Sequence, residues 1–151
     1  MSFFPDLDGV VERFLACRLS GKEWTHQAHL AVGLWHVHRY GAEDALTRLR
    51  AGIRRLNESH GTPNSTTRGY HETITRAYAQ LLSDFLSTCP VEMPLAERVA
   101  HLIASPVADK DVLLRFYSRE RLMSTSARAE WMEPDIMVLR VAAISGSGVE
   151  R

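Results

Sequence analysis

Three histidines near the starts of two expected helices are the residues best suited to chemistry. His26 and His29 lie in the segment WTHQAHL, residues 24–30, and His71 lies in GYHET, residues 69–73. Residues three apart are neighbours on one helix face, so His26 and His29 can offer two imidazoles to one ion. A third imidazole would complete the three-ligand set of many catalytic metal sites, which keep one position open for water or substrate.

The elements that must position these histidines follow from hydrophobic spacing and from cap residues. Apolar residues recur at helical spacing throughout, and no convincing strand pattern is present. We expect an all-α, compact single-domain helical bundle of about five to seven helices over residues 1–151. The main helices are expected at residues 7–19, 25–40, 42–57, 68–87 and 94–104. Shorter helices are expected at 109–117, 118–123 and 135–143, followed by a frayed tail at 145–151.

The order of these helices suggests how the histidines could meet. Short connections favour antiparallel neighbours, so the helices at 25–40 and 68–87 should be parallel, with their starts at the same end of the bundle. His71 should face inward, since it lies about in line with Ile74, Tyr78 and Leu82. The pattern therefore predicts that His26, His29 and His71 bind a divalent metal ion.

Polar and aromatic residues next to these histidines are candidates for substrate contacts and catalysis. Glu72 could orient a histidine, form a salt bridge or act as a base, and Tyr70 could supply a polar contact. Arg68 and Thr67 could hold an anionic group, and Trp24 could form a wall of the pocket.

The run at residues 64–68, Asn-Ser-Thr-Thr-Arg, has two interpretations. Its hydroxyls, backbone N–H groups and guanidinium could bind a carboxylate or a phosphate. Alternatively, Thr66 or Thr67 could simply cap the helix that follows.

Composition narrows the classes of partner. The 18 Lys and Arg residues balance the 18 Asp and Glu residues, so no net charge favours nucleic acid or an anionic membrane. The N-terminal sequence lacks an apolar run of signal-peptide length, and no stretch is apolar enough to span a membrane. Cys17 and Cys89 form no CxxC pair and are expected to be core thiols. We therefore expect a cytoplasmic protein without nucleic-acid or membrane partners.

The paired WTHQAHL and GYHET segments resemble motifs of a family of small, uncharacterised bacterial proteins. This resemblance covers about residues 23–78 and implies that the two segments belong together. In overall layout the chain also resembles DinB-like helical-bundle metalloproteins, which place a histidine triad between helices. It departs from their pattern because its close histidine pair lies on the second helix with a spacing of three.

The leading hypothesis is a small helical metalloprotein, with hydrolase-like or transferase-like activity on a small anionic substrate. Zinc, iron, nickel and manganese all suit imidazole ligands. One alternative is a metal-free binding module whose His, Tyr and Arg side chains line a pocket for a small molecule. Another is a scaffold that works through an exposed helix face. The sequence leaves a homo-oligomer open, and the histidines could also be purely structural.

Overall fold

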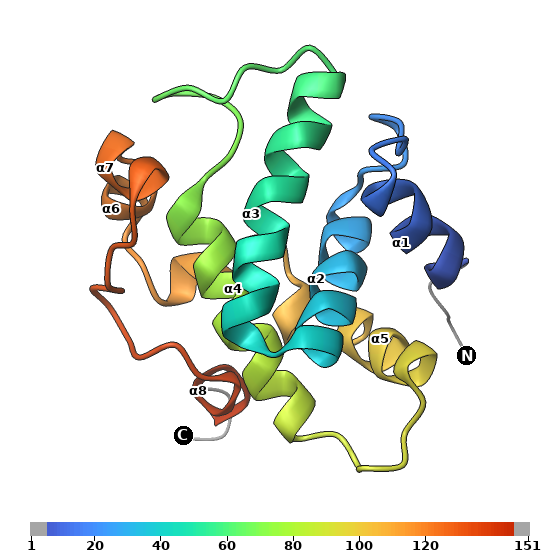
Figure 1. Ribbon diagram of the computed structural model, residues 1–151. Helices are drawn as coiled ribbons and strands as arrows, with labels where there is room; N and C mark the ends of the chain where they lie inside the picture. Colours follow the sequence, from blue (N-terminus) through green and yellow to red (C-terminus); the bar gives the residue numbers. More distant parts are fainter. Residues whose placement is uncertain (1–5, 147–151) are drawn as a thin grey trace.

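Five helices of nine or more residues form the bundle within residues 6–146, which are the residues that the computed structural model describes (Figure 1). This confirms the expected all-α fold, and these residues contain no strand. None of the helices is both long and apolar enough to cross a bilayer, as far as the described residues go. The five helices are α1 (Leu7–Leu15), α2 (His26–Tyr40), α3 (Ala42–Ser59), α4 (Glu72–Ser87) and α5 (Leu95–Ile103).

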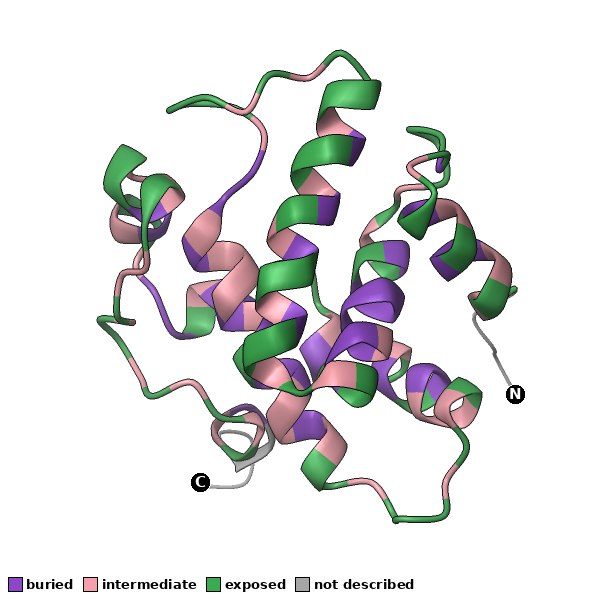
Figure 2. Cartoon of the chain, viewed as in Figure 1, coloured by how far each residue is buried: buried purple, intermediate pink, exposed green. Residues whose placement is uncertain are grey.

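Helix α2 is the central element of the bundle. It packs against α1, α3, α4 and α5, and Figure 2 shows buried residues around much of its circumference. Thr25 caps it, because the Thr25 hydroxyl accepts a hydrogen bond from the Ala28 N–H at 3.1 Å. Gly41 ends it at a positive φ of 82°, a conformation that glycine adopts without strain. Figure 1 shows α2 and α4 running in the same sense, with α3 antiparallel to both, as the short connections predict.

Helix α4 begins four residues later than its sequence pattern suggests. Gly69 has a positive φ of 83°, and His71 is extended, so the chain becomes helical only at Glu72. The predicted capping by Thr66 or Thr67 is therefore wrong. The cap is His71, whose Nδ1 accepts a hydrogen bond from the Ile74 N–H at 3.1 Å.

The C-terminal third contains shorter helices than expected. It includes two 3₁₀ turns, and both α6 and α7 follow serine caps. The helix expected at 135–143 is wrong, because this segment is mostly irregular and Asp135 accepts a hydrogen bond from the Ser118 N–H instead of opening a helix. The elements are 3₁₀ turns at Pro106–Ala108 and Val112–Arg115, then α6 (Arg119–Leu122), α7 (Thr125–Ala129) and α8 (Val141–Gly146). Of the expected frayed tail, residues 147–151 lie outside the described residues.

Helix α1 also ends early, at Leu15, because Cys17 adopts a left-handed conformation with a φ of 60°.

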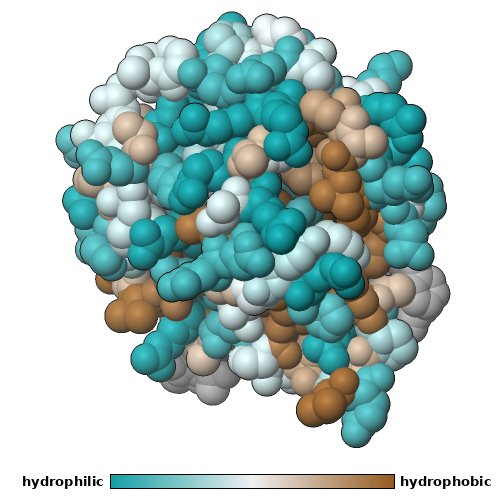
Figure 3. Space-filling view, viewed as in Figure 1, coloured by the Kyte–Doolittle hydropathy of each residue, from teal (hydrophilic) through white to brown (hydrophobic). Residues whose placement is uncertain are grey.

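Large exposed hydrophobic side chains are scattered over α1, two loops and the C-terminal segment. Figure 3 shows a largely hydrophilic face with a hydrophobic band along the edge between α3 and α1. Exposed apolar residues that are scattered singly are normal on protein surfaces and indicate no docking face by themselves.

A partly buried carboxylate joins the start of α4 to α3. Glu72 accepts two hydrogen bonds from Arg50, at 2.9 Å and 2.7 Å, and a third at 2.8 Å from the Tyr70 hydroxyl. The Arg50 bonds are the main cause that lowers the pKa of Glu72 below its ordinary value of 4.5. The Glu72 side chain is only 13% exposed, so this interaction is shielded from solvent more than a surface ion pair.

We expect Glu72→Gln to lower the free energy of unfolding by about 1.5–3 kcal/mol at pH 7, because it removes a charge-assisted bidentate contact. A carboxyl with a lowered folded pKa stabilises the fold above its unfolded pKa and loses this effect as pH falls through the folded value. The difference between wild type and variant should therefore shrink below about pH 4.5. Urea denaturation from pH 3 to pH 7 would measure this difference in the free energy of unfolding. Glu92→Gln, at an exposed turn, is the control, and a pH-independent difference would contradict the charge-based explanation.

Candidate functional site

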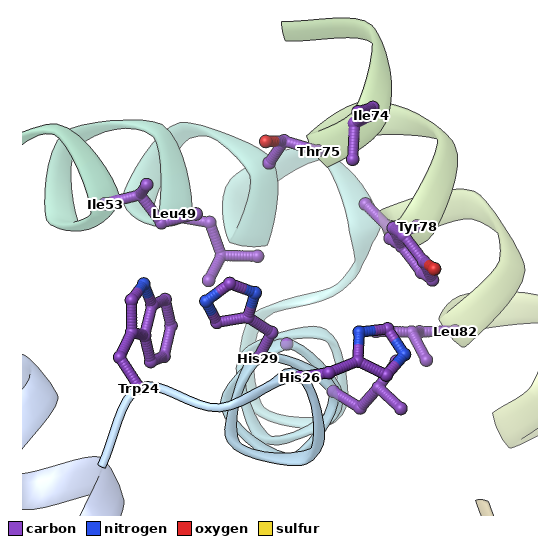
Figure 4. A pocket seen from close by; sticks show the side chains of 12 residues that line it. Trp24, His26, His29, Leu49, Ile53, Ile74, Thr75, Tyr78 and Leu82 are labelled. Atoms are coloured by element: carbon purple, nitrogen blue, oxygen red, sulfur yellow. The ribbon is translucent and has the colours of Figure 1, made fainter. Parts of the chain in front are cut away.

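A hollow between α2, α3 and α4 contains two of the three predicted metal-ligating histidines. It encloses about 100 Å³, and Figure 4 shows Trp24 and His29 beneath α3 and His26 beside Tyr78 of α4. Its walls are mainly apolar, and polar groups come from few side chains. The lining residues are Trp24, His26, His29, Leu30, Gly33, Leu49, Ile53, Ile74, Thr75, Tyr78, Ala79 and Leu82.

His29 is one of the polar residues of this hollow that have no hydrogen-bond partner within residues 6–146. Neither of its ring nitrogens bonds another residue within the described chain. Its ring packs on Trp24 with 3.9 Å between ring centroids, and the residue is exposed to solvent. Desolvation by the surrounding apolar groups lowers the pKa of His29 to about 4, and the nearby His26 adds to this shift. The imidazole is therefore neutral at neutral pH and can accept a hydrogen bond.

His26 and Tyr78 form the other end of the hollow. The Nε2 of His26 donates a hydrogen bond to the Ala108 carbonyl at 3.0 Å, which leaves Nδ1 as the other ring nitrogen. The Tyr78 ring lies 6.3 Å from the His26 ring, edge to face. Burial, then the charges of Asp109 and Asp111, raise the pKa of Tyr78 to about 12. Its hydroxyl therefore stays protonated and has no bonded partner in residues 6–146.

His71, the third predicted ligand, lies outside this hollow and uses both ring nitrogens elsewhere. Its Nδ1 caps α4, and its Nε2 donates to the Leu122 carbonyl at 2.9 Å. His71 is buried, and burial is the main cause that lowers its pKa. The structure therefore does not bring the three imidazoles together. Across residues 6–146, no group of three His, Cys, Asp or Glu side chains is placed to hold a metal ion.

The separation of His71 from His26 and His29 has a simple geometric cause. The helices are parallel as expected, but His26 at the first position of α2 lies beside Tyr78, seven residues after His71. Seven residues correspond to about 10 Å along a helix axis. The start of α4 therefore extends beyond the start of α2 by almost two turns, and His71 meets the α6 segment instead.

The two residues expected to be catalytic, Tyr70 and Glu72, instead help to fix the start of α4 against α3 in this structure. Tyr70 is buried, and its hydroxyl donates to Glu72, whose carboxylate is held by Arg50. Thr73, the next residue of the motif, fixes the start of α4 to the C-terminal segment. Its hydroxyl donates a hydrogen bond to the Glu130 carbonyl and accepts one from the Met132 N–H. Neither Tyr70 nor Glu72 lines the hollow.

The predicted substrate contacts divide between the hollow and an exposed loop. Trp24 does line the hollow, whereas Thr67 and Arg68 are exposed and lie in the loop before α4. Their backbone N–H groups both point to the Ser65 hydroxyl, at 3.3 Å and 3.2 Å. This turn satisfies the N–H groups that an anion would have needed.

Sequence reasoning did not select Tyr78, Thr75 or the α3 residues Leu49 and Ile53 as parts of the site. Tyr78 was recognised only as part of an apolar stripe. The available signal was its spacing from Ile74 on the face that meets α2, combined with a hydroxyl that an apolar core would leave without a partner.

The comparisons with known proteins identify no relative of this chain: no protein-family model, no curated protein and no solved structure matches it significantly.

Proposed function

We propose that the hollow between α2, α3 and α4 binds a small, largely apolar molecule that donates one hydrogen bond to His29. The observation that supports this proposal most is the neutral, unpartnered imidazole at an otherwise apolar wall. A ligand that supplies an N–H or O–H to His29 and buries its apolar part against Leu49 and Ile53 would gain from both contacts.

The size of the hollow limits the ligand. Pockets for drug-sized molecules measure roughly 300–1,000 Å³, and this hollow encloses about 100 Å³. A single ring or a short branched chain is therefore the part that fits inside. The indole of Trp24 offers an aromatic face beside His29, which favours a planar ring carrying a hydroxyl or an N–H group.

The pKa of His29 favours binding over acid–base catalysis. A general base works best when its pKa is near the operating pH, whereas the pKa of His29 is about 4. Such a ring accepts a hydrogen bond at pH 7 but takes up a proton poorly. We therefore propose a metal-free binding module in preference to a hydrolase or a transferase.

A metal-dependent enzyme is the second candidate, and one observation favours it. His26 donates its Nε2 hydrogen to a backbone carbonyl, as metal-ligating histidines usually do with the nitrogen that does not bind the metal. His26 and His29 could then hold zinc, iron, nickel or manganese as a pair, with water or substrate at the remaining positions. This version uses two histidines in place of three, and His71 would have no part in it.

Phenol and anisole provide a matched test of the binding proposal, because they are similar in size and only phenol can donate a hydrogen bond. We expect phenol to bind the wild-type protein about tenfold more tightly than anisole, the effect of one net hydrogen bond. His29→Phe should remove this difference, and His29→Gln, which keeps an acceptor, should restore part of it. Titration followed by NMR would measure both affinities. His101→Phe on the exposed side of α5 is the control, and equal binding of the two probes to wild type would refute the role of His29.

The protonation of His29 can be measured directly. We expect its ring proton signals to titrate with a midpoint near pH 4, because the apolar surroundings disfavour the charged ring. Since phenol would bind the neutral ring, its affinity should be constant from pH 6 to pH 8 and fall by about half at pH 4. A titration midpoint near 6.5 would show that the ring is not desolvated.

Metal dependence separates the two candidates. We expect the phenol affinity of tag-free protein to be the same in EDTA and after one equivalent of Zn²⁺. The second candidate instead requires stoichiometric metal uptake that is lost in His26→Ala and His29→Ala and kept in His71→Asn. Asparagine is a suitable replacement because it also caps helices. Metal analysis after gel filtration would distinguish the two patterns.

A further inference from the structure

A second cleft lies on the opposite side of α4 from the hollow. It encloses about 240 Å³, and its lining shares no residue with that of the hollow. Arg76 and Gln80 supply the α4 wall, and they lie two residues from Tyr78, which is about 200° around the helix. The remaining lining residues are Trp131, Glu133, Pro134, Met137, Val138 and Leu139.

Arg76 is a cation without an anionic partner in this cleft. Its guanidinium lies over the Trp131 ring at 4.5 Å from the ring centroid, and the residue is half-buried. Within residues 6–146 it forms no hydrogen bond or ion pair. Contact with an aromatic face orients the guanidinium plane and leaves its N–H edge available. That edge matches the two oxygens of a carboxylate.

Gln80 adds a second donor one turn further along the same face. Its side-chain amide is exposed and has no bonded partner within the described chain. The opposite wall of the cleft is apolar, and Val138 there is 66% exposed. A ligand with a short hydrocarbon chain would bury part of this surface.

We propose that this cleft is a binding site for a small organic carboxylate with a short apolar chain. The carboxylate pairs with the N–H edge of Arg76 and accepts a hydrogen bond from the Gln80 amide. The chain lies along Met137, Val138 and Leu139. The anionic ligand expected from the sequence would thus bind at Arg76, not at Arg68, and this site is independent of the function proposed for the hollow.

Glu133 provides a test of whether the ligand of the cleft is an anion. Its carboxylate accepts a hydrogen bond from the Trp131 indole at 3.0 Å, which holds this acidic side chain at the edge of the cleft. This charge should weaken the binding of an anion. Glutamine at this position would keep an acceptor oxygen for the indole and remove the repulsion.

Hexanoate, hexanol and acetate are the probes, used with the intact protein in NMR or calorimetric titrations. We expect hexanoate to bind more tightly than hexanol, which lacks the charge, and than acetate, which lacks the chain. Arg76→Gln should weaken hexanoate by about tenfold or more, and Arg76→Lys should also weaken it because lysine lacks the planar fork. Glu133→Gln should strengthen it by about threefold at low salt.

Arg55→Gln, at an exposed position on α3, is the matched control and should leave the affinity unchanged. Hexanol binding as tightly as hexanoate would overturn the proposal, as would weaker binding in Glu133→Gln. Unchanged affinity in a folded Arg76→Gln variant would also overturn it. Because phenol binding in the hollow is measured separately, failure here leaves the function proposed for the hollow untouched.

Discussion

The position of α4 depends on how its first residues are fixed. His71 caps the helix with one ring nitrogen and holds the Leu122 carbonyl with the other, while Glu72 is bound to Arg50 of α3. These contacts fix both the height and the rotation of α4. Tyr78 and Arg76 lie on opposite sides of this helix. The contacts of His71 and Glu72 therefore determine the geometry of both the hollow and the Arg76 cleft.

The histidines differ mainly in whether their rings already have a hydrogen-bond partner. His26, His36, His60 and His71 each have a ring nitrogen at 2.7–3.0 Å from a backbone carbonyl oxygen. Such histidines contribute to the stability of the fold through these bonds to the main chain. His29 has no such bond, although it packs against Trp24 in an apolar hollow. Its ring nitrogens are therefore available to a ligand, and this makes His29 the centre of the proposed site.

The sequence predicted the features that depend on local chemistry. The Thr25 cap, the stop at Gly41 and the helical character of the five main helices follow from cap residues and apolar spacing within a few positions. The start of α4 was misplaced because the helical spacing continues upstream of Glu72. The positive φ of Gly69 and the side-chain cap of His71 outweigh that pattern. Similarly, the segment around Asp135 has residues typical of a helix start, but its carboxylate bonds the Ser118 N–H from a distant part of the chain.

The candidate site was harder to predict, because a metal triad requires axial register as well as direction. The sequence indicates that α2 and α4 are parallel, but the relative height of two packed helices is set by long-range contacts. Here these are the bonds of GYHET residues to Leu122, Glu130 and Arg128. A shift of about 10 Å, almost two helical turns, is enough to place Tyr78 where His71 was expected. The partner of a helix-borne histidine is therefore determined by the contacts that fix helix height, and in this chain those contacts come from Arg50 of α3 and from the C-terminal third.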